Sequence, residues 1–165
     1  MLTAGILTIS DKGARGERQD KSGEAIREIL STMDVHIAKY EIVADEKDLI
    51  AQTLARWADE GDLDVLLTTG GTGLTPRDVT PEATLSVVER VVPGFAEAMR
   101  AESLKKTPTA MLSRAVVGTR GKCLIVNLPG SPKAVRECLT VIIPALPHAV
   151  ETLKGQAGDC GTAQA

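Results

Sequence analysis

The sequence predicts a single α/β domain, a three-layer α/β/α sandwich around a mostly parallel sheet. Short apolar, strand-favouring segments alternate with segments of helical periodicity, which is typical of β-α-β units with right-handed crossovers. The 165 residues suffice for one sizeable core and are too few for two ordinary domains. Apolar residues make up 43% of the chain and aromatic residues only 2%, so aliphatic side chains must fill the core. We expect residues 1–155 to form this domain and residues 156–165 to be a disordered tail.

The first strand and helix follow from the start of the chain. Residues 4–9 form an apolar strand, and a polar loop over residues 12–21 comes next. Ser22 has the side chain of a helix N-cap, and the apolar residues from Ala25 to Met33 fall on one face of the helix that would follow. We expect this face to pack on the core.

A second strand and helix, and then a third strand, come next. Residues 35–43 favour a strand whose alternation slips around Lys39, which indicates an edge position or a bulge. Asp45 can cap the following helix, which ends at Gly61. Residues 64–69 are a short apolar run bounded by glycines, as expected of a buried central strand.

Proline positions mark the helices of the middle of the chain. Thr80 is a good N-cap, and Pro81 suits the first helical position because its missing N–H would have no partner there. After a Pro-Gly break, residues 95–106 read as another helix, and a short helix should open at Pro108.

The last third of the chain predicts a strand pair and two helices. Residues 115–118 and 123–128 are strands joined by a tight turn. Ser131 can cap the helix that follows, and Pro144 should bend or break the helical run over residues 135–154.

Charge and cysteine usage exclude several classes of protein. A net charge of −3 lacks the basic footprint of nucleic-acid binding, so we expect no nucleic-acid partner. Cys123, Cys138 and Cys160 fit neither a disulfide framework nor a paired metal site, and His36 and His148 lie without a ligand pattern around them. No stretch is long and apolar enough to span a membrane, and the apolar start has no basic leader. We therefore expect a cytoplasmic protein with no membrane partner.

The strand at residues 64–69 runs into a glycine-rich loop that carries charged side chains. Gly70, Gly71 and Gly73 match neither a Walker A loop nor the dinucleotide fingerprint, and a tight turn without a ligand is the alternative interpretation. Arg77 and Asp78 favour a site, because an arginine can pair with phosphate oxygens and an aspartate can hold a magnesium ion that bridges them.

Other polar residues follow strands at the same edge of the predicted sheet. Ser10 and Asp11 end the first strand, where open α/β sheets place their ligands. Asp45 follows the second strand and can act as a helix cap, share a magnesium ion with Asp78, or both. The amides near Gly130 are free for an anion, although Lys133 beside them can equally be a solvated side chain. The loop over residues 12–21, taken alone, favours a solvated turn over a site.

Several separated motifs then resemble those of a known family, the molybdopterin adenylyltransferases, over residues 5–155. This family includes the bacterial Mog proteins, related plant G domains and the gephyrin G domains. The motifs that carry the resemblance are, in chain order, Thr8-Ile-Ser-Asp11, Gln19-Asp-Lys-Ser-Gly23, Thr69-Gly-Gly-Thr-Gly73, Pro76-Arg-Asp-Val-Thr-Pro-Glu-Ala-Thr84, Met111-Leu-Ser-Arg114 and Asn127-Leu-Pro-Gly-Ser-Pro-Lys133.

The resemblance implies a reaction and a set of residues. With magnesium and ATP, the terminal phosphate of molybdopterin attacks the α-phosphate, pyrophosphate leaves and adenylylated molybdopterin forms. Asp45 and Asp78 match the essential acidic residues, which serve magnesium and catalysis. The implied substrate-binding residues are Ser10, Asp11, Asp20, Ser22, Thr69, Gly70, Gly71, Thr72, Gly73, Arg77, Ser103, Ser113, Arg114, Gly130, Ser131, Pro132 and Lys133.

The resemblance also implies partners and leaves an alternative open. A homotrimer is expected, with possible hand-over of the product to a molybdate-inserting enzyme. The alternative is a non-catalytic molybdopterin-binding paralogue of the same fold, like the Moa B-type proteins. The presence of both Asp45 and Asp78 favours the enzyme.

Overall fold

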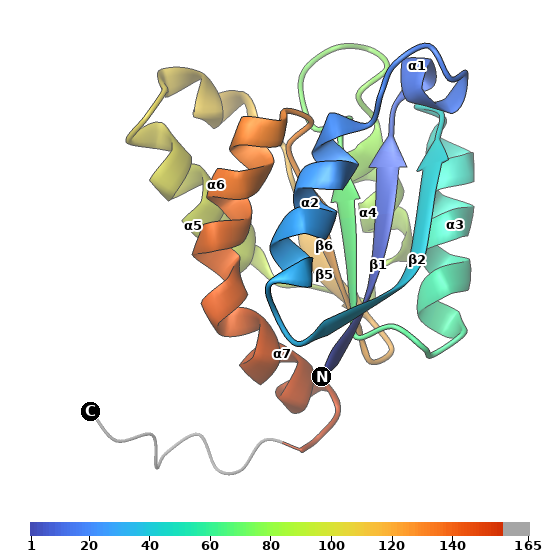
Figure 1. Ribbon diagram of the computed structural model, residues 1–165, viewed down its shortest axis with the longest axis vertical. Coiled ribbons are helices and arrows are strands. Elements are labelled where there is room, and N and C mark those ends of the chain that lie inside the picture. Colours follow the sequence, from blue (N-terminus) through green and yellow to red (C-terminus); the bar gives the residue numbers. More distant parts are fainter. Residues whose placement is uncertain (157–165) are drawn as a thin grey trace.

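The computed structural model describes residues 1–156, which form one six-stranded sheet covered by helices on both faces (Figure 1). The strand order is β2-β1-β3-β6-β5-β4. Four neighbouring strands are parallel, namely β2 (Val35–Val43), β1 (Leu2–Ile9), β3 (Val65–Thr69) and β6 (Cys123–Leu128). The antiparallel edge consists of β5 (Val117–Arg120) and β4 (Arg90–Val91). The predicted fold class is confirmed, and the tail prediction lies outside the described residues apart from Gln156.

The helices divide between the two faces because β1, β3 and β6 point alternate apolar side chains to opposite sides. On one side, Leu67 and Val126 pack with helices α2 (Lys21–Ser31), α5 (Pro93–Leu104), α6 (Pro132–Ile142) and α7 (Leu146–Leu153). On the other side, Leu66 and Ile125 pack with α3 (Lys47–Asp59) and α4 (Thr80–Val87). Leu66 and Leu67 are completely buried, and truncating either to alanine would cost about 2–5 kcal/mol of stability. In the part of the chain described, no helix combines the length and apolar content that crossing a bilayer requires.

Three short helical segments complete the fold: α1 (Asp11–Ala14) and the 3-10 turns η1 (Pro108–Leu112) and η2 (Ile143–Ala145). The short helix expected at Pro108 is therefore a 3-10 turn, and η2 contains Pro144, where the bend was predicted. The slip expected near Lys39 is confirmed as a register shift in edge strand β2, because Ala4 pairs with Ile37 and Gly5 with Lys39.

The caps expected for α2 and α4 are wrong, as is that expected for α3, where Glu46 and not Asp45 is the N-cap. Asp20 is the N-cap of α2 and accepts a hydrogen bond from the Gly23 amide, while Ser22 lies inside the helix and donates to Asp20. Val79 precedes α4, and Thr80 instead donates its hydroxyl to the Gly70 carbonyl. In both cases the candidate side chain has a tertiary or local partner that the cap rule does not consider.

Strand β4 was missed because two residues carry no periodicity, and α5 begins at Pro93 because proline is well placed in a first helical turn.

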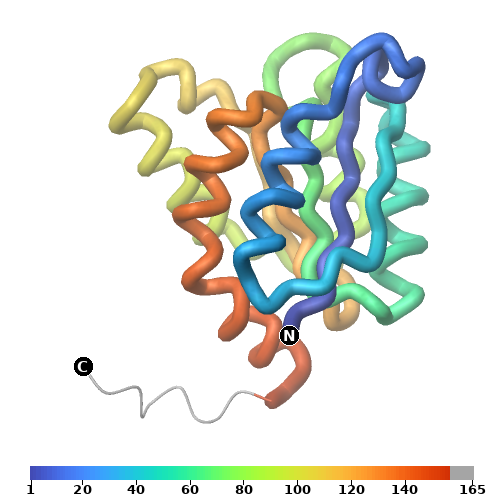
Figure 2. The backbone as a smooth tube through the Cα atoms, viewed as in Figure 1, coloured from blue at the N-terminus to red at the C-terminus, as the bar shows by residue number. Residues whose placement is uncertain are grey.

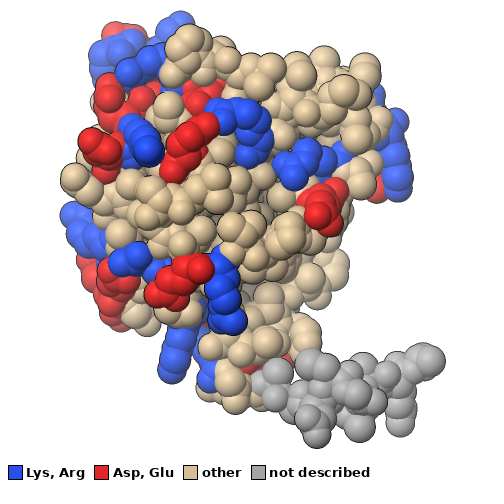
Figure 3. Space-filling view, turned by 180° about the vertical axis from the view of Figure 1, so that it is seen from behind, with Lys and Arg blue, Asp and Glu red and all other residues tan. Residues whose placement is uncertain are grey.

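The parallel strands all end at the same edge of the sheet. At this edge the loop after β3 (green) and the segment around α1 (blue) come together (Figure 2). Seen from behind the view of Figure 1, positive and negative side chains are interspersed, and this side of the molecule has no continuous basic surface (Figure 3).

Candidate active site

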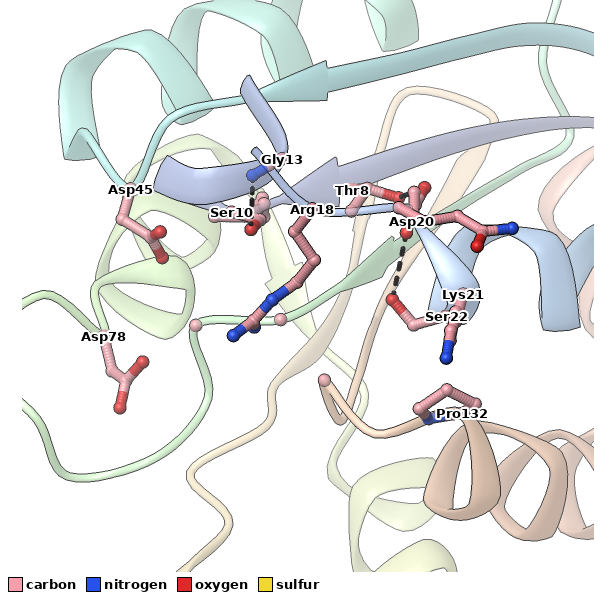
Figure 4. Close-up of a pocket in the computed structure, with 15 residues that line it drawn as sticks. Thr8, Ser10, Gly13, Arg18, Asp20, Lys21, Ser22, Asp45, Asp78 and Pro132 are labelled. Carbon is pink, nitrogen blue, oxygen red and sulfur yellow. Dashed lines mark hydrogen bonds between the residues drawn. The ribbon is translucent and has the colours of Figure 1, made fainter. Parts of the chain in front are cut away.

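A cleft of about 610 Å³ lies at this edge, and it is lined by residues that follow all four parallel strands (Figure 4). The contributing residues are Thr8 to Ser10, Gly13 and Arg18 to Ser22 after or at the end of β1, Asp45 after β2, Gly70, Gly71 and Asp78 after β3, and Gly130 and Pro132 after β6. The structure thus brings together side chains separated by more than a hundred positions in the sequence.

Backbone geometry explains the glycines on the floor of this cleft. Gly70 has φ 99° and Gly71 has φ 68°, where residues other than glycine are strained. A Cβ on Gly70 would lie 2.3 Å from the Ile9 carbonyl oxygen, and one on Gly71 would lie 2.3 Å from the Thr80 hydroxyl oxygen. Among the described residues the amides of Gly71 and Gly130 donate to no protein acceptor, so they can serve an anion.

Asp45 is not the helix cap that the sequence favoured. The N-cap of α3 is Glu46, with no side-chain cap bond, and the Asp45 carboxylate instead accepts the Asp11 amide at 2.8 Å. The Asp11 carboxylate accepts the Asp45 amide at 3.0 Å in return. Burial raises the pKa of Asp45, and the nearby charges of Asp11 and Asp78 raise it further. Asp45 is therefore a partly buried carboxylate facing the cleft, where a cation would be favoured.

Asp78 is held in the loop by its own turn. Its Oδ2 accepts the Thr75 amide at 3.0 Å, and a Cβ on Gly73 would lie 2.8 Å from the same oxygen. Asp45 and Asp78 lie at the same end of the cleft, on different elements (Figure 4). In residues 1–156 no cluster of three or more histidine, cysteine or acidic side chains could hold a metal alone. A cation at this pair would take its remaining ligands from water or from a bound phosphate.

Arg77 lies outside the cleft lining and is engaged with protein carboxylates. Its guanidinium donates to both carboxylate oxygens of Asp11, at 3.0 and 2.9 Å, and to Glu46 at 2.8 Å. These contacts lower the pKa of Asp11. In this structure Arg77 therefore fastens the tip of the Asp78 loop to the ends of β1 and β2. The phosphate contact expected for Arg77 stays a prediction.

Asp20 anchors the segment that closes the side of the cleft. Its carboxylate accepts hydrogen bonds from Thr8 at 2.6 Å, from the Gly23 amide at 2.9 Å and from the hydroxyl of Tyr40 on β2. Burial, with the hydrogen bond to Asp20, raises the pKa of Tyr40. This network fixes the residues on either side of Asp20.

Arg18 and Lys21 flank Asp20 and are the basic cleft residues that the predicted site does not include; the other lining residues outside the predicted site are Thr8, Ile9, Gly13 and Gln19. Both line the cavity, and among the described residues neither side chain has a hydrogen-bond or ion-pair partner. They are the cations available to an anionic ligand. Lys21 belongs to the motif Gln19 to Gly23 and Arg18 directly precedes it, but the charged loop, taken alone, favoured a solvated turn.

A second cleft, of about 290 Å³, lies on the other side of the loop after β6. The hydroxyl-bearing residues Ser103, Ser113 and Ser131 line it, together with apolar residues that include Met99. The loop residues alternate between the clefts: Pro129 and Ser131 line the second, and Gly130 and Pro132 the first. The two cavities are thus neighbours across a single stretch of backbone.

The remaining predicted site residues lie outside both linings. They are Asp11, Thr69, Thr72, Gly73, Arg77, Arg114 and Lys133. Thr69 donates to the Pro129 carbonyl at 2.7 Å and joins the loops after β3 and β6. Lys133 is exposed in the first turn of α6. Arg114 contacts the Asp78 loop through the carbonyls of Gly73 and Asp78.

Fold and cleft define an α/β protein with a polar cleft at the carboxyl edge of its parallel strands, where open α/β sheets place their ligands. A family model described as "Probable molybdopterin binding domain" matches residues 5–148. The chain belongs to this family.

Named relatives agree with this assignment. The molybdopterin adenylyltransferase of Helicobacter pylori strain J99 is 49% identical over 156 residues, covering 92% of this chain and 87% of the relative. That of Escherichia coli strain K12 is 40% identical over 168 residues, covering 93% and 86%. The crystal structure of the molybdopterin biosynthesis enzyme MoaB from Thermus thermophilus is similar with a TM-score of 0.89 at 55% identity, covering 94% of this chain and 98% of that one.

Proposed function

We propose that this chain is a molybdopterin adenylyltransferase of molybdenum cofactor biosynthesis, which uses magnesium and ATP to adenylylate molybdopterin and releases pyrophosphate. Relatives of that name at 40% and 49% identity support the activity. The observation that carries the proposal is the composition of the first cleft. It combines two carboxylates, free loop amides and two unpaired cations at one edge of the sheet.

We assign the nucleotide phosphates to the first cleft. Arg18 and Lys21 neutralise their charge, and the amides of Gly71 and Gly130 donate to their oxygens. Asp45 and Asp78 would hold the magnesium ion, whose chemistry is to neutralise phosphate charge and orient the leaving group. The partial burial of Asp45 beside other carboxylates supports this role, since a cation relieves that repulsion.

We assign the pterin to the second cleft. Its serine hydroxyls can donate to and accept from a flat polar ring, while Met99 and the neighbouring alanines supply an apolar surface. A molecule seated there can reach across the Gly130 loop with its terminal phosphate, which supplies the nucleophile. One phosphate oxygen forms a bond to the α-phosphorus as the bond to the bridging oxygen breaks, so the protein must mainly align two anions.

The alternative of binding without turnover has one observation in its favour. A solved neighbour at 55% identity carries the name MoaB, which the sequence interpretation associated with a pterin-binding paralogue. That neighbour is also described as an enzyme, and this chain has both acidic residues. The enzyme is therefore the proposal, and the carrier is the outcome that would replace it.

The test is product formation, followed by mass spectrometry after incubation of the protein with molybdopterin, ATP and magnesium. The Asp78→Asn variant keeps an oxygen that can accept the Thr75 amide, so its loop should remain folded while the charge is lost. Asp62→Asn, an exposed site between α3 and β3, is the matched control. We expect adenylylated molybdopterin from the native protein and from Asp62→Asn, with a loss of about 100-fold or more in Asp78→Asn. Tight pterin binding without product from the native protein would establish the carrier instead.

The assembly and the destination of the product are also proposals. A homotrimer is supported by the family resemblance and by large apolar side chains at the surface, Leu74, Leu85 and Val91, which are 65%, 50% and 51% exposed. Light scattering should then give three times the chain mass of 17.4 kDa. Hand-over to a molybdate-inserting enzyme rests on the resemblance and on the need of a later step to consume the adenylylated product.

A further inference from the structure

The guanidinium of Arg114, a residue that the family resemblance assigns to substrate binding, contacts acceptors of the protein itself. Its guanidinium donates to the Gly73 carbonyl at 2.8 Å and to the Asp78 carbonyl at 2.7 Å, and it forms an ion pair with Glu82. Its backbone amide donates to the Thr72 carbonyl at 2.9 Å. Every one of these acceptors belongs to the loop after β3 or to the helix that follows it.

These contacts fix the part of the loop that presents Asp78. Gly73 and Asp78 begin and end the turn that Thr75 closes through the Asp78 carboxylate. A single guanidinium therefore holds both ends of this turn through two different nitrogen atoms, whereas lysine carries all its donors on one nitrogen. The pairing with Glu82 also lowers the pKa of that carboxyl and compensates the arginine charge. Arg18 and Lys21, in contrast, are free to meet substrate charge.

The same segment is held from the side of the second cleft. Arg100 on α5 donates to the Ala115 carbonyl at 3.0 Å and, more weakly, to the Ser113 carbonyl at 3.4 Å. Arg100 and Ser113 both line the second cleft. Residues 113–115 are therefore a short bridge, with one cavity on one side and the Asp78 loop on the other.

We propose that Arg114 is a positioning residue that holds Asp78 in place and couples occupancy of the second cleft to the order of the Asp78 loop. The coupling, but not the positioning, rests on the proposed function, because it requires a pterin in the second cleft. A ligand that contacts Ser113 restrains the bridge, and Arg114 passes this restraint to residues 73–78 as reduced freedom of the loop. Asp78 is then ordered when the nucleophilic substrate is present.

The test is hydrogen–deuterium exchange of a peptide covering residues 70–80, in the native protein, in Arg114→Lys and in Arg136→Lys. Arg136 forms an exposed ion pair with Glu28 on α2, so it controls for the loss of an arginine–glutamate pair elsewhere. We expect Arg114→Lys to raise exchange of this peptide about tenfold or more, and Arg136→Lys to leave it unchanged. Added molybdopterin should slow the exchange in the native protein, and much less in Arg114→Lys.

Binding measurements separate the possible failures. ATP affinity should change by less than about threefold in Arg114→Lys while kcat falls about tenfold or more, because the residue acts on Asp78 and not on the nucleotide. A large loss of ATP affinity with native exchange would make Arg114 a substrate ligand and overturn the positioning role. Equal protection by molybdopterin in both proteins would overturn the coupling. Failure of molybdopterin to bind the native protein would overturn the proposed function and the coupling, while the exchange of the free proteins would still decide the positioning role.

Discussion

The glycine at position 70 offers the sharpest test of why the loop after β3 has its sequence. Alanine at this position needs φ near 99° and puts its Cβ 2.3 Å from the Ile9 carbonyl oxygen, which belongs to the backbone of the neighbouring strand. Neither obstacle can be relieved by a side-chain rotation. Gly70→Ala must therefore displace either the loop or the end of β1.

The magnitude follows from two separable terms. Gly61, at the end of α3, has φ 78° and nothing within 4 Å of an added Cβ, so Gly61→Ala carries the left-handed penalty alone. That penalty is about 1–2 kcal/mol. Gly70→Ala adds overpacking against backbone, which contributes about 1–3 kcal/mol more. We therefore expect about 2–5 kcal/mol of destabilisation at Gly70 against about 1–2 kcal/mol at Gly61.

The assay is urea unfolding followed by the fluorescence of Trp57, the only tryptophan of the chain, which lies on α3 and is 5% exposed. Equal m-values would show that the free energies of unfolding can be compared directly. Gly70→Ala should also lower product formation by more than its stability loss explains, because the Gly71 amide moves with it. Equal stability loss in both variants, within about 0.5 kcal/mol, would refute the argument that the contact with Ile9 requires glycine.

Two further predictions concern the charges of the first cleft. The folded-state pKa of Asp45 is raised, so ionisation of this carboxyl destabilises the fold as pH rises through that pKa. Asp45→Asn should therefore be more stable than the native protein at pH 7 by up to about 1 kcal/mol, and this advantage should disappear near pH 4. Urea unfolding at both pH values checks the prediction, and a variant that is less stable at pH 7 would contradict the sign. Arg18→Gln and Lys21→Gln should each raise the KM for ATP about tenfold and weaken ATP binding measured by calorimetry. The control Lys122→Gln, at the opposite end of β6, should leave both quantities unchanged. Unchanged ATP affinity in both cleft variants would show that the phosphates do not bind on this side of the cleft.

Regular elements of the fold could be predicted because their signals are local. The buried strands around Leu66 and Ile125 are apolar runs bounded by turn residues, and the slip near Lys39 is visible as a break in alternation. The caps of α2 and α4 could not be predicted in the same way. Ser22 and Thr80 are both good cap residues, but Asp20 occupies one cap position, and the Thr80 hydroxyl serves the Gly70 carbonyl. Side chains with several available partners are assigned by tertiary structure, which a local rule does not contain.

The placement of charges in the site shows the same limit more clearly. Arg18, Lys21, Arg77 and Arg114 are all basic residues in or next to motifs, and the sequence favours the last two for substrate binding. The structure provides protein acceptors for Arg77 and Arg114, because the ends of β1 and β2 bring Asp11 and Glu46 to the one, and the loop after β3 brings its carbonyls to the other.

A guanidinium that satisfies the backbone of a glycine-rich loop does something that a substrate phosphate could not, since it restrains the loop before any ligand arrives and leaves only the remaining freedom for a ligand to remove. A restrained loop loses less conformational entropy when the substrate binds and its carboxylate is fixed in place. The cations that meet the phosphates must, conversely, remain free in the unliganded protein, and Arg18 and Lys21 satisfy that condition because the network around Asp20 fixes their backbone without using their charges. Division of the basic residues into those that hold the loop and those that wait for the ligand therefore follows from which acceptors the fold places within reach.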